Sequence, residues 1–115
     1  MEDIKSLKSL LSQVKSLASV TDAVIMTKTG MFILGSLRRS TSMDKFVGMA
    51  AILMGSAEAA SMEMEDPVKG VVIRLNNQKI VFMSVTEDLL LAVIFRGKRA
   101  DDTLLEEIEQ LIAEQ

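Results

Sequence analysis

The pattern of apolar and polar positions is dominated by one stretch, Ser42 to Met64, which predicts a single long helix. The twelve residues from Phe46 to Ala57 carry no charge, and large apolar side chains point to most sides of the helix. A helix on a globular surface usually has one apolar stripe and one polar face. This helix needs apolar cover on two sides, and its own sheet supplies only one. We predict self-association through it; burial within its own domain is the alternative.

Both ends of the chain show apolar residues at helical spacing. The stripe from Ile4 to Ala18 is flanked by lysines and predicts an amphipathic helix. A second stripe lies within Ala100–Gln115 and predicts an acidic helix there. Thr103 with Glu106 fits a capping box for this last helix, and a start at Asp101 is the alternative.

Five short runs rich in β-branched and large aliphatic residues predict five strands. Lys28-Thr29-Gly30 separates the first two runs and Asn76-Asn77 the third and fourth, as in antiparallel hairpins. The last run is almost continuously apolar, so we expect it in the middle of a sheet covered on both faces. The long helix must end before Asp66-Pro67, because proline disfavours helical geometry in the residue ahead of it. The predicted strands are Ala23–Thr27, Met31–Ser36, Val68–Leu75, Gln78–Val85 and Leu89–Phe95.

The elements follow the order helix-strand-strand-helix-strand-strand-strand-helix within one domain that covers residues 1–115. This order predicts an α+β fold with a five-stranded antiparallel sheet. We expect the two terminal helices on one face and the long central helix on the other, in a sandwich of three layers.

The composition argues against most catalytic and cofactor chemistry. Without Cys or His, the chain has no thiolate nucleophile, no cysteine-held metal and no imidazole base, so a nucleophilic serine lacks its usual partner. A net charge of −3 and the absence of Trp and Tyr argue against nucleic acid as a partner. We predict a protein that is not an enzyme and that needs no cofactor or metal.

The same features indicate a cytoplasmic protein. Met1-Glu2-Asp3 is acidic and leads into an amphipathic pattern, unlike a secretory signal. The uncharged part of the long helix is shorter than the roughly 20 residues that a membrane span needs. We therefore expect no direct membrane insertion.

Two kinds of charged cluster are candidate sites. Asp101-Asp102 with Glu106-Glu107 is the densest group of carboxylates, but it lacks the glycine-bearing loop of a calcium site, and acids favour a helix N-terminus. Arg38-Arg39, or the basic segment Arg96–Arg99, could bind phosphate. Because no glycine-rich phosphate loop precedes a helix, exposed basic loops are the simpler interpretation.

The succession of strand, glycine turn, strand and alanine-rich helix resembles the Roadblock-type dynein light chain domains. The resemblance rests on Val20–Met26, on Thr29-Gly30 and on Met31–Leu34, followed by the long helix, three strands and a short acidic helix. It covers essentially the whole chain and is closest to the stand-alone prokaryotic type. Thr29 stands where an acidic residue often precedes the turn glycine.

The resemblance implies a dimer. In such domains the central helices pair antiparallel, and the strand after that helix joins its mate in a continuous sheet. Carried over by position, Ser42–Met64 and Val68–Leu75 would lie at the interface. The interface residues expected from this are Phe46, Val47, Ala50, Ala51, Met54, Ala57, Val71 and Ile73.

The resemblance also implies a partner, because members act as scaffolds and regulators of Ras-like small GTPases or as cargo-adaptor subunits of dynein. Our hypothesis is a non-enzymatic homodimer that binds a Ras-like small GTPase through its paired helices. Partner contacts are expected at Met49, Ile52, Leu53, Ser56, Arg38 and Arg39, the two arginines as potential arginine fingers.

Three alternatives remain open. A ligand-sensing profilin- or PAS-like domain would be a monomer with a pocket between sheet and helix. An enzyme that uses a carboxylate pair would lose metal-dependent turnover when Asp102 or Glu106 is changed. A structural adaptor subunit of a larger assembly would form the same dimer with a different partner.

Overall fold

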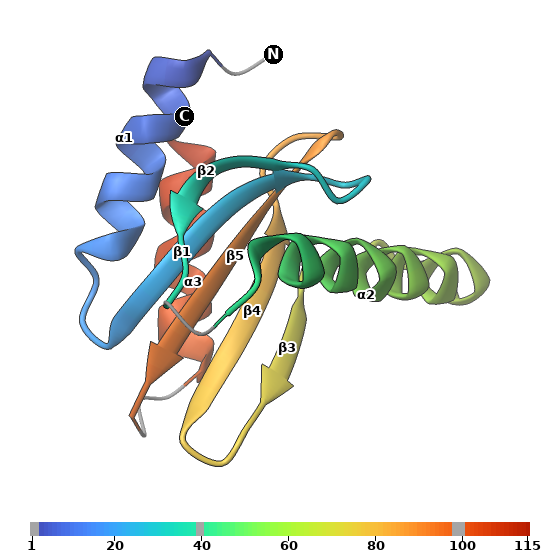
Figure 1. Ribbon diagram of the computed structural model, residues 1–115. Coiled ribbons are helices and arrows are strands. Elements are labelled where there is room, and N and C mark those ends of the chain that lie inside the picture. Colours follow the sequence, from blue (N-terminus) through green and yellow to red (C-terminus); the bar gives the residue numbers. More distant parts are fainter. Residues whose placement is uncertain (1–2, 39–40, 98–100) are drawn as a thin grey trace.

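A five-stranded antiparallel sheet lies between two layers of helices in the computed structural model, which describes residues 3–38, 41–97 and 101–115 (Figure 1). The strands lie in the order β2-β1-β5-β4-β3, so β5 is central and β2 and β3 form the edges. This arrangement confirms the predicted α+β fold and the central position of the last strand. The elements are α1 (Ile4–Lys15), β1 (Val20–Thr27), β2 (Phe32–Ser36), α2 (Met43–Met64), β3 (Val71–Arg74), β4 (Gln78–Ser84), β5 (Leu89–Arg96) and α3 (Asp101–Ala113).

The terminal helices α1 and α3 cover one face of the sheet, as predicted. Asp3 caps α1, because its carboxylate accepts a hydrogen bond of 2.8 Å from the backbone N–H of Ser6. This bond stabilises the ionised carboxylate and lowers the pKa of Asp3. The core on this side consists of Leu7, Leu10, Val14, Ala23, Ile25, Val81, Met83, Leu91, Val93, Phe95, Leu104 and Ile108.

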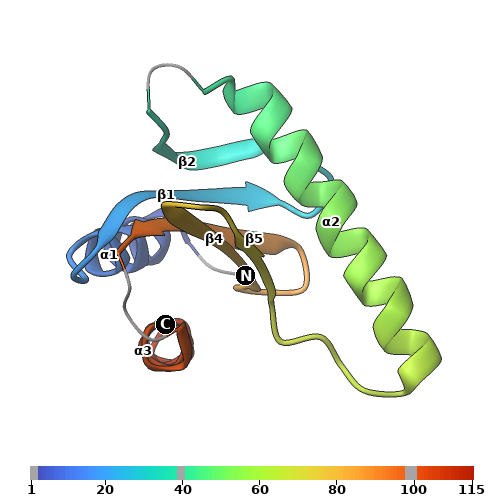
Figure 2. The same ribbon diagram turned by 90° about the horizontal axis from the view of Figure 1, so that it is seen from below.

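The long helix α2 covers part of the opposite face (Figure 2). The ring of Phe46 lies over that of Phe82 from β4, with the ring centroids 5.9 Å apart and tilted. Because both faces of the sheet are covered, β1 and β5 are buried over nearly their whole length, which explains their near-continuous apolar sequences. The core on this side consists of Val24, Met26, Phe46, Val47, Ala50, Met54, Phe82, Leu90, Ala92 and Ile94.

Both ends of α2 lie where the sequence predicts. The Ser42 hydroxyl accepts a hydrogen bond of 3.4 Å from the backbone N–H of Lys45 and caps the helix. The helix ends at Met64, Glu65 follows in the left-handed conformation with φ 54°, and Pro67 comes next. None of the helices in the described part of the chain is long and apolar enough to cross a membrane.

Several boundaries differ from the prediction, and β1 begins at Val20 and not at Ala23. The helix α1 ends at Lys15 and not at Ala18. The strand β3 begins only at Val71, because Val68 packs against the core beneath α2 and takes no part in the ladder. The helix α3 begins at Asp101, so the capping box at Thr103 is wrong and the earlier start is confirmed.

Candidate interaction surface

The C-terminal half of α2, from Gly55 to Met64, contains no fully buried residue. The buried residues of the helix end at Met54, and every residue from Gly55 to Met64 is half-buried or exposed. Figures 1 and 2 both show this half extending beyond the sheet. This half of the helix carries few charges, so it exposes small residues and large apolar side chains to solvent. Large exposed apolar patches mark interaction sites in soluble proteins.

The outward face of α2 is apolar in its middle part, from Gly48 to Ala59, and carries charged residues at both ends. We call the residues Gly48, Ile52, Gly55 and Ala59 the outer seam, because their spacing places them on one line of the helix. Ile52 is 71% exposed, and a methyl group added at Gly48 or Gly55 would meet no described atom within 4 Å outside the helix's own backbone. The large side chain of Ile52 therefore stands between two glycines, Gly48 and Gly55, which have no side chain. Further exposed apolar side chains on the helix are Met49 (39%), Met62 (80%) and Met64 (76%).

The edge strand β3 is a second exposed apolar element. Its sequence Val71-Val72-Ile73 is uncharged, and Val72 and the adjacent Leu75 are 39% and 47% exposed. On its outer side the strand has no neighbour in the described sheet. An apolar edge of this kind offers its backbone for pairing with another strand.

Most of the residues expected at a dimer interface lie elsewhere than on this surface. Phe46, Val47, Ala50 and Met54 are at most 6% exposed and pack against their own sheet, so in this structure their side chains present no surface to a second chain. Ala51 and Ala57 are half-buried on the flanks of α2. Val71 and Ile73 are half-buried and pack beneath α2, while the backbone of their strand forms the open edge.

The residues expected at a partner contact are mostly on the open face. Met49, Ile52 and Ser56 are exposed, and Leu53 is half-buried against the core beneath α2. Arg38 lies away from this face, with its Nε 3.6 Å from a carboxylate oxygen of Asp22. Arg39 lies outside the described residues.

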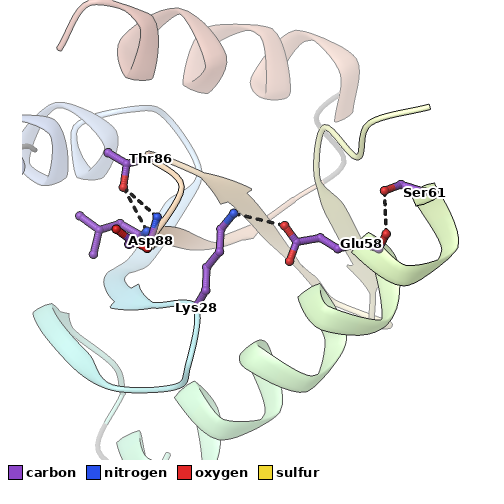
Figure 3. A network of polar contacts seen from close by, with 6 residues as sticks. Lys28, Glu58, Ser61, Thr86 and Asp88 are labelled. Atoms are coloured by element: carbon purple, nitrogen blue, oxygen red, sulfur yellow. Dashed lines mark hydrogen bonds and ion pairs between the residues drawn. The ribbon is translucent and has the colours of Figure 1, made fainter. Parts of the chain in front are cut away.

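The turn between β1 and β2 holds the flank of α2. Lys28 donates from Nζ to Glu58 of α2 at 3.2 Å (Figure 3). Its backbone N–H donates to the carbonyl of Asp88 at 2.9 Å. The hydroxyl of Thr86 accepts from the backbone N–H of Asp88 and so shapes the turn between β4 and β5. Gly30, at φ 93°, faces the backbone of α2 so closely that a Cβ would lie 3.5 Å from Gly48 Cα. These contacts fix the direction in which α2 leaves the sheet.

The carboxylate cluster of α3 is described only in part. Glu106 is exposed and Glu107 half-buried on α3, while the side chains of Asp101 and Asp102 lie outside the description. Among the side chains that are described, no group of three or more acids comes together as metal ligands would.

Sequence reasoning missed Gly48, Gly55, Ala59 and Met62 as members of the outward face. Their small or flexible side chains carry no chemistry of their own, and the helix is apolar on all sides, so periodicity does not separate its inner from its outer face. The one available signal was the lack of charge near the middle of the helix, where a solvent-facing side would normally carry some.

Comparison with known proteins agrees with this fold. Residues 7–95 match the family model described as the Roadblock/LC7 domain. A search of curated proteins finds no match. All three solved structures reported below are less than 25% identical to the chain, so their likeness concerns the fold.

The similar structures are bacterial. A Roadblock/LC7 domain from Streptomyces avermitilis is 20% identical with a TM-score of 0.79, and the match covers 92% of this chain and 91% of that one. MglB from Myxococcus xanthus is 11% identical with a TM-score of 0.85, over 98% and 94% of the two chains. The gliding protein MglB from Thermus thermophilus is 10% identical with a TM-score of 0.71, over 100% and 96%.

Proposed function

Because the chain belongs to the Roadblock/LC7 family, we propose that it is a non-enzymatic homodimer that binds and regulates a Ras-like small GTPase through α2. The family is one of regulators in small-GTPase pathways. The observation that carries the proposal for this chain is the uncovered apolar face of α2, with Ile52 at 71% exposure in its middle. Its cytoplasmic location, where such GTPases act, is part of the proposal.

The first step of the proposal is the pairing of two α2 helices along the outer seam. In an antiparallel pair centred on the seam, Ile52 of each subunit lies opposite Gly55 of the other, because the two residues are equally far from the seam's midpoint. A large side chain then faces a gap left by a glycine, which permits close approach of the two backbones. The contact is the same on both subunits, as twofold symmetry requires.

The second step is the joining of the two sheets through β3. The open edge of this strand is uncharged from Val71 to Ile73, and it lies on the side of the sheet toward which α2 extends (Figure 1). Pairing of the two edges would satisfy backbone groups that otherwise face water, and it would protect an apolar edge from unspecific association.

The third step is docking of the GTPase on the part of α2 that the pairing leaves free. Met49 and Ser56 lie on one flank of the outer seam, and Met62 and Met64 lie toward the end of the helix. Methionine side chains are flexible and fit irregular partner surfaces. In this proposal the chain acts on GTP hydrolysis by ordering the partner's own catalytic groups, since Arg38 lies beside Asp22, away from the open face of α2.

The test is direct binding to purified Ras-like small GTPases from the same genome, each loaded with GDP or with a non-hydrolysable GTP analogue. We expect saturable binding that depends on the nucleotide, and a changed rate of GTP hydrolysis by the GTPase. The variant Met49→Asp should weaken binding and preserve the dimer, because Met49 is 39% exposed beside the seam.

A matched control is Met31→Asp, which places the same charge on a methionine that is 64% exposed in the turn between β1 and β2. It should leave GTPase binding unchanged. A dimer that binds none of the GTPases in either nucleotide state would refute the proposed partner and leave the structural adaptor as the function.

A further inference from the structure

A second site lies on the same side of the sheet as α2, at the end that α2 leaves uncovered. There Asp22, Arg96 and Gln78 come from three neighbouring strands, paired as Asp22 with Ile94 and Gln78 with Arg96. Each is two positions from a residue that packs beneath α2, so all three side chains face that side. With Arg38 and Thr41 from the segment before α2, they line a pocket of about 340 Å³.

The pocket combines an apolar floor with a charged rim. Ile80, Ile94 and Phe46 supply the apolar lining, and Asp22, Arg38 and Arg96 supply the charges. Two cations and one anion leave a net charge of +1. The N-terminal end of α2, which carries positive partial charge, adds to this potential because Thr41 and Phe46 bring it to the pocket.

One arginine of the pair is held in place. Asp22 is only 8% exposed, and its carboxylate lies 3.6 Å from Nε of Arg38. The carbonyl of Arg38 accepts a hydrogen bond of 2.9 Å from the backbone N–H of Thr41. Contact through Nε leaves both terminal amino groups of the guanidinium without an acceptor among the described residues.

The other arginine, Arg96, has no charge partner among the described residues. Within the described part of the chain, no carboxylate forms an ion pair with Arg96, although this guanidinium lines the same pocket. A free arginine fork beside a second, pre-oriented one is suited to a carboxylate or phosphate group, which guanidinium groups bind bidentately.

We propose that this pocket binds a small organic anion, whose carboxylate or phosphate head lies between Arg38 and Arg96 and whose apolar body lies on Ile80 and Ile94. The volume is at the lower end of small-molecule sites, which suits a ligand of a few carbon atoms. This inference does not depend on the dimer or on the GTPase, because the pocket is built within one chain.

The test uses amide NMR spectra of the labelled full chain at constant ionic strength. Hexanoate and inorganic phosphate are the anionic probes, and hexylamine, protonated at pH 7, is the control with the same chain and the opposite charge. We expect hexanoate to shift the signals of Asp22, Gln78 and Arg96 saturably, and hexylamine to leave them in place. Tighter binding of phosphate than of hexanoate would identify phosphate as the head group, and the reverse would identify a carboxylate.

The variant Arg96→Gln should weaken binding of hexanoate about tenfold or more, because a charge-assisted hydrogen bond is lost. Arg96 is exposed, so this variant should fold normally. Arg74→Gln is the matched control: it removes the same charge from an exposed arginine of β3 that is not part of the pocket. The proposal fails if neither anion gives saturable shifts at these residues, if hexylamine binds as well as hexanoate, or if both arginine variants weaken binding equally.

Discussion

Truncation of one exposed side chain on α2 should dissociate the proposed dimer. Ile52 is 71% exposed in the single chain, and full burial of an isoleucine contributes about 1.5–3 kcal/mol. If pairing covers the exposed part, Ile52→Ala removes about 1–2 kcal/mol from each subunit. The change occurs twice in a symmetric dimer, so the dissociation free energy falls by about 2–4 kcal/mol, which is a roughly 30-fold to 1000-fold higher Kd.

The assay is sedimentation equilibrium across a wide range of protein concentrations. The chain has neither Trp nor Tyr, so interference optics should replace absorbance at 280 nm. On dilution the measured mass should fall from twice 12.6 kDa toward 12.6 kDa. The variant should show this fall at a much higher protein concentration than the wild type. Alanine is also the better helix former, so any change in the intrinsic stability of α2 works against the expected loss.

Ile4→Ala is the matched control, because it makes the same change at an isoleucine that is 53% exposed on α1, across the sheet from α2. It should leave the Kd unchanged. The reasoning is refuted if Ile52→Ala changes the Kd by less than about threefold, or if Ile4→Ala weakens the dimer as much.

Three further predictions concern single positions. Gly55→Leu should leave the fold of one subunit intact, because nothing described lies within 4 Å of the new Cβ, but it should abolish the dimer by blocking close approach; a dimeric variant in light scattering would contradict this. Gly35→Ala should lower the free energy of unfolding by about 3 kcal/mol, because the position has φ 113° and the new Cβ would clash with the Ala23 carbonyl and lie 2.8 Å from Val24 Cα. A loss below about 1 kcal/mol in chemical unfolding would show that β1 and β2 separate easily. Asp3 has a lowered pKa in the folded chain because the Ser6 N–H stabilises its charged form. Its contribution to stability is therefore present above the unfolded pKa near 3.8 and is lost as the pH falls through the folded pKa. The variant Asp3→Asn caps the helix without titrating, so its stability should lack this pH dependence, and a pH profile identical to that of the wild type would refute the assignment.

The order of elements and the layers could be predicted from the sequence because each rests on local patterns. The stripe of α1, the caps of α2 at Ser42 and before Pro67, and the apolar run of β5 are all set by neighbours along the chain. The run in β5 also indicated its central place in the sheet, since only a strand covered on both faces can be apolar throughout.

The orientation of α2 could not be predicted, because the helix is apolar all round. Phe46 and Met54 are large enough to serve either face, and only the position of the Phe82 ring beneath Phe46 shows which side faces the sheet. The second site was out of reach for another reason. Arg38 and Arg96 are far apart in sequence, and they line one pocket only once the sheet has formed, with β1 paired to β5 and Arg38 beside Asp22 of β1.

The pairing of α2 can be tested most directly by distances between spin labels. The chain has no Cys, so Lys45→Cys and Met62→Cys each carry a single label at an exposed position on α2. The two positions are 17 residues apart and equally far from the midpoint of the outer seam. In an antiparallel pair each label therefore lies about 25–30 Å from its copy, from a rise of 1.5 Å per residue and helix axes about 8–10 Å apart. Pulsed EPR should give this one distance for both variants. A distance near about 10 Å in both would mean parallel helices, and the absence of any defined distance would mean that α2 does not pair two copies of this chain.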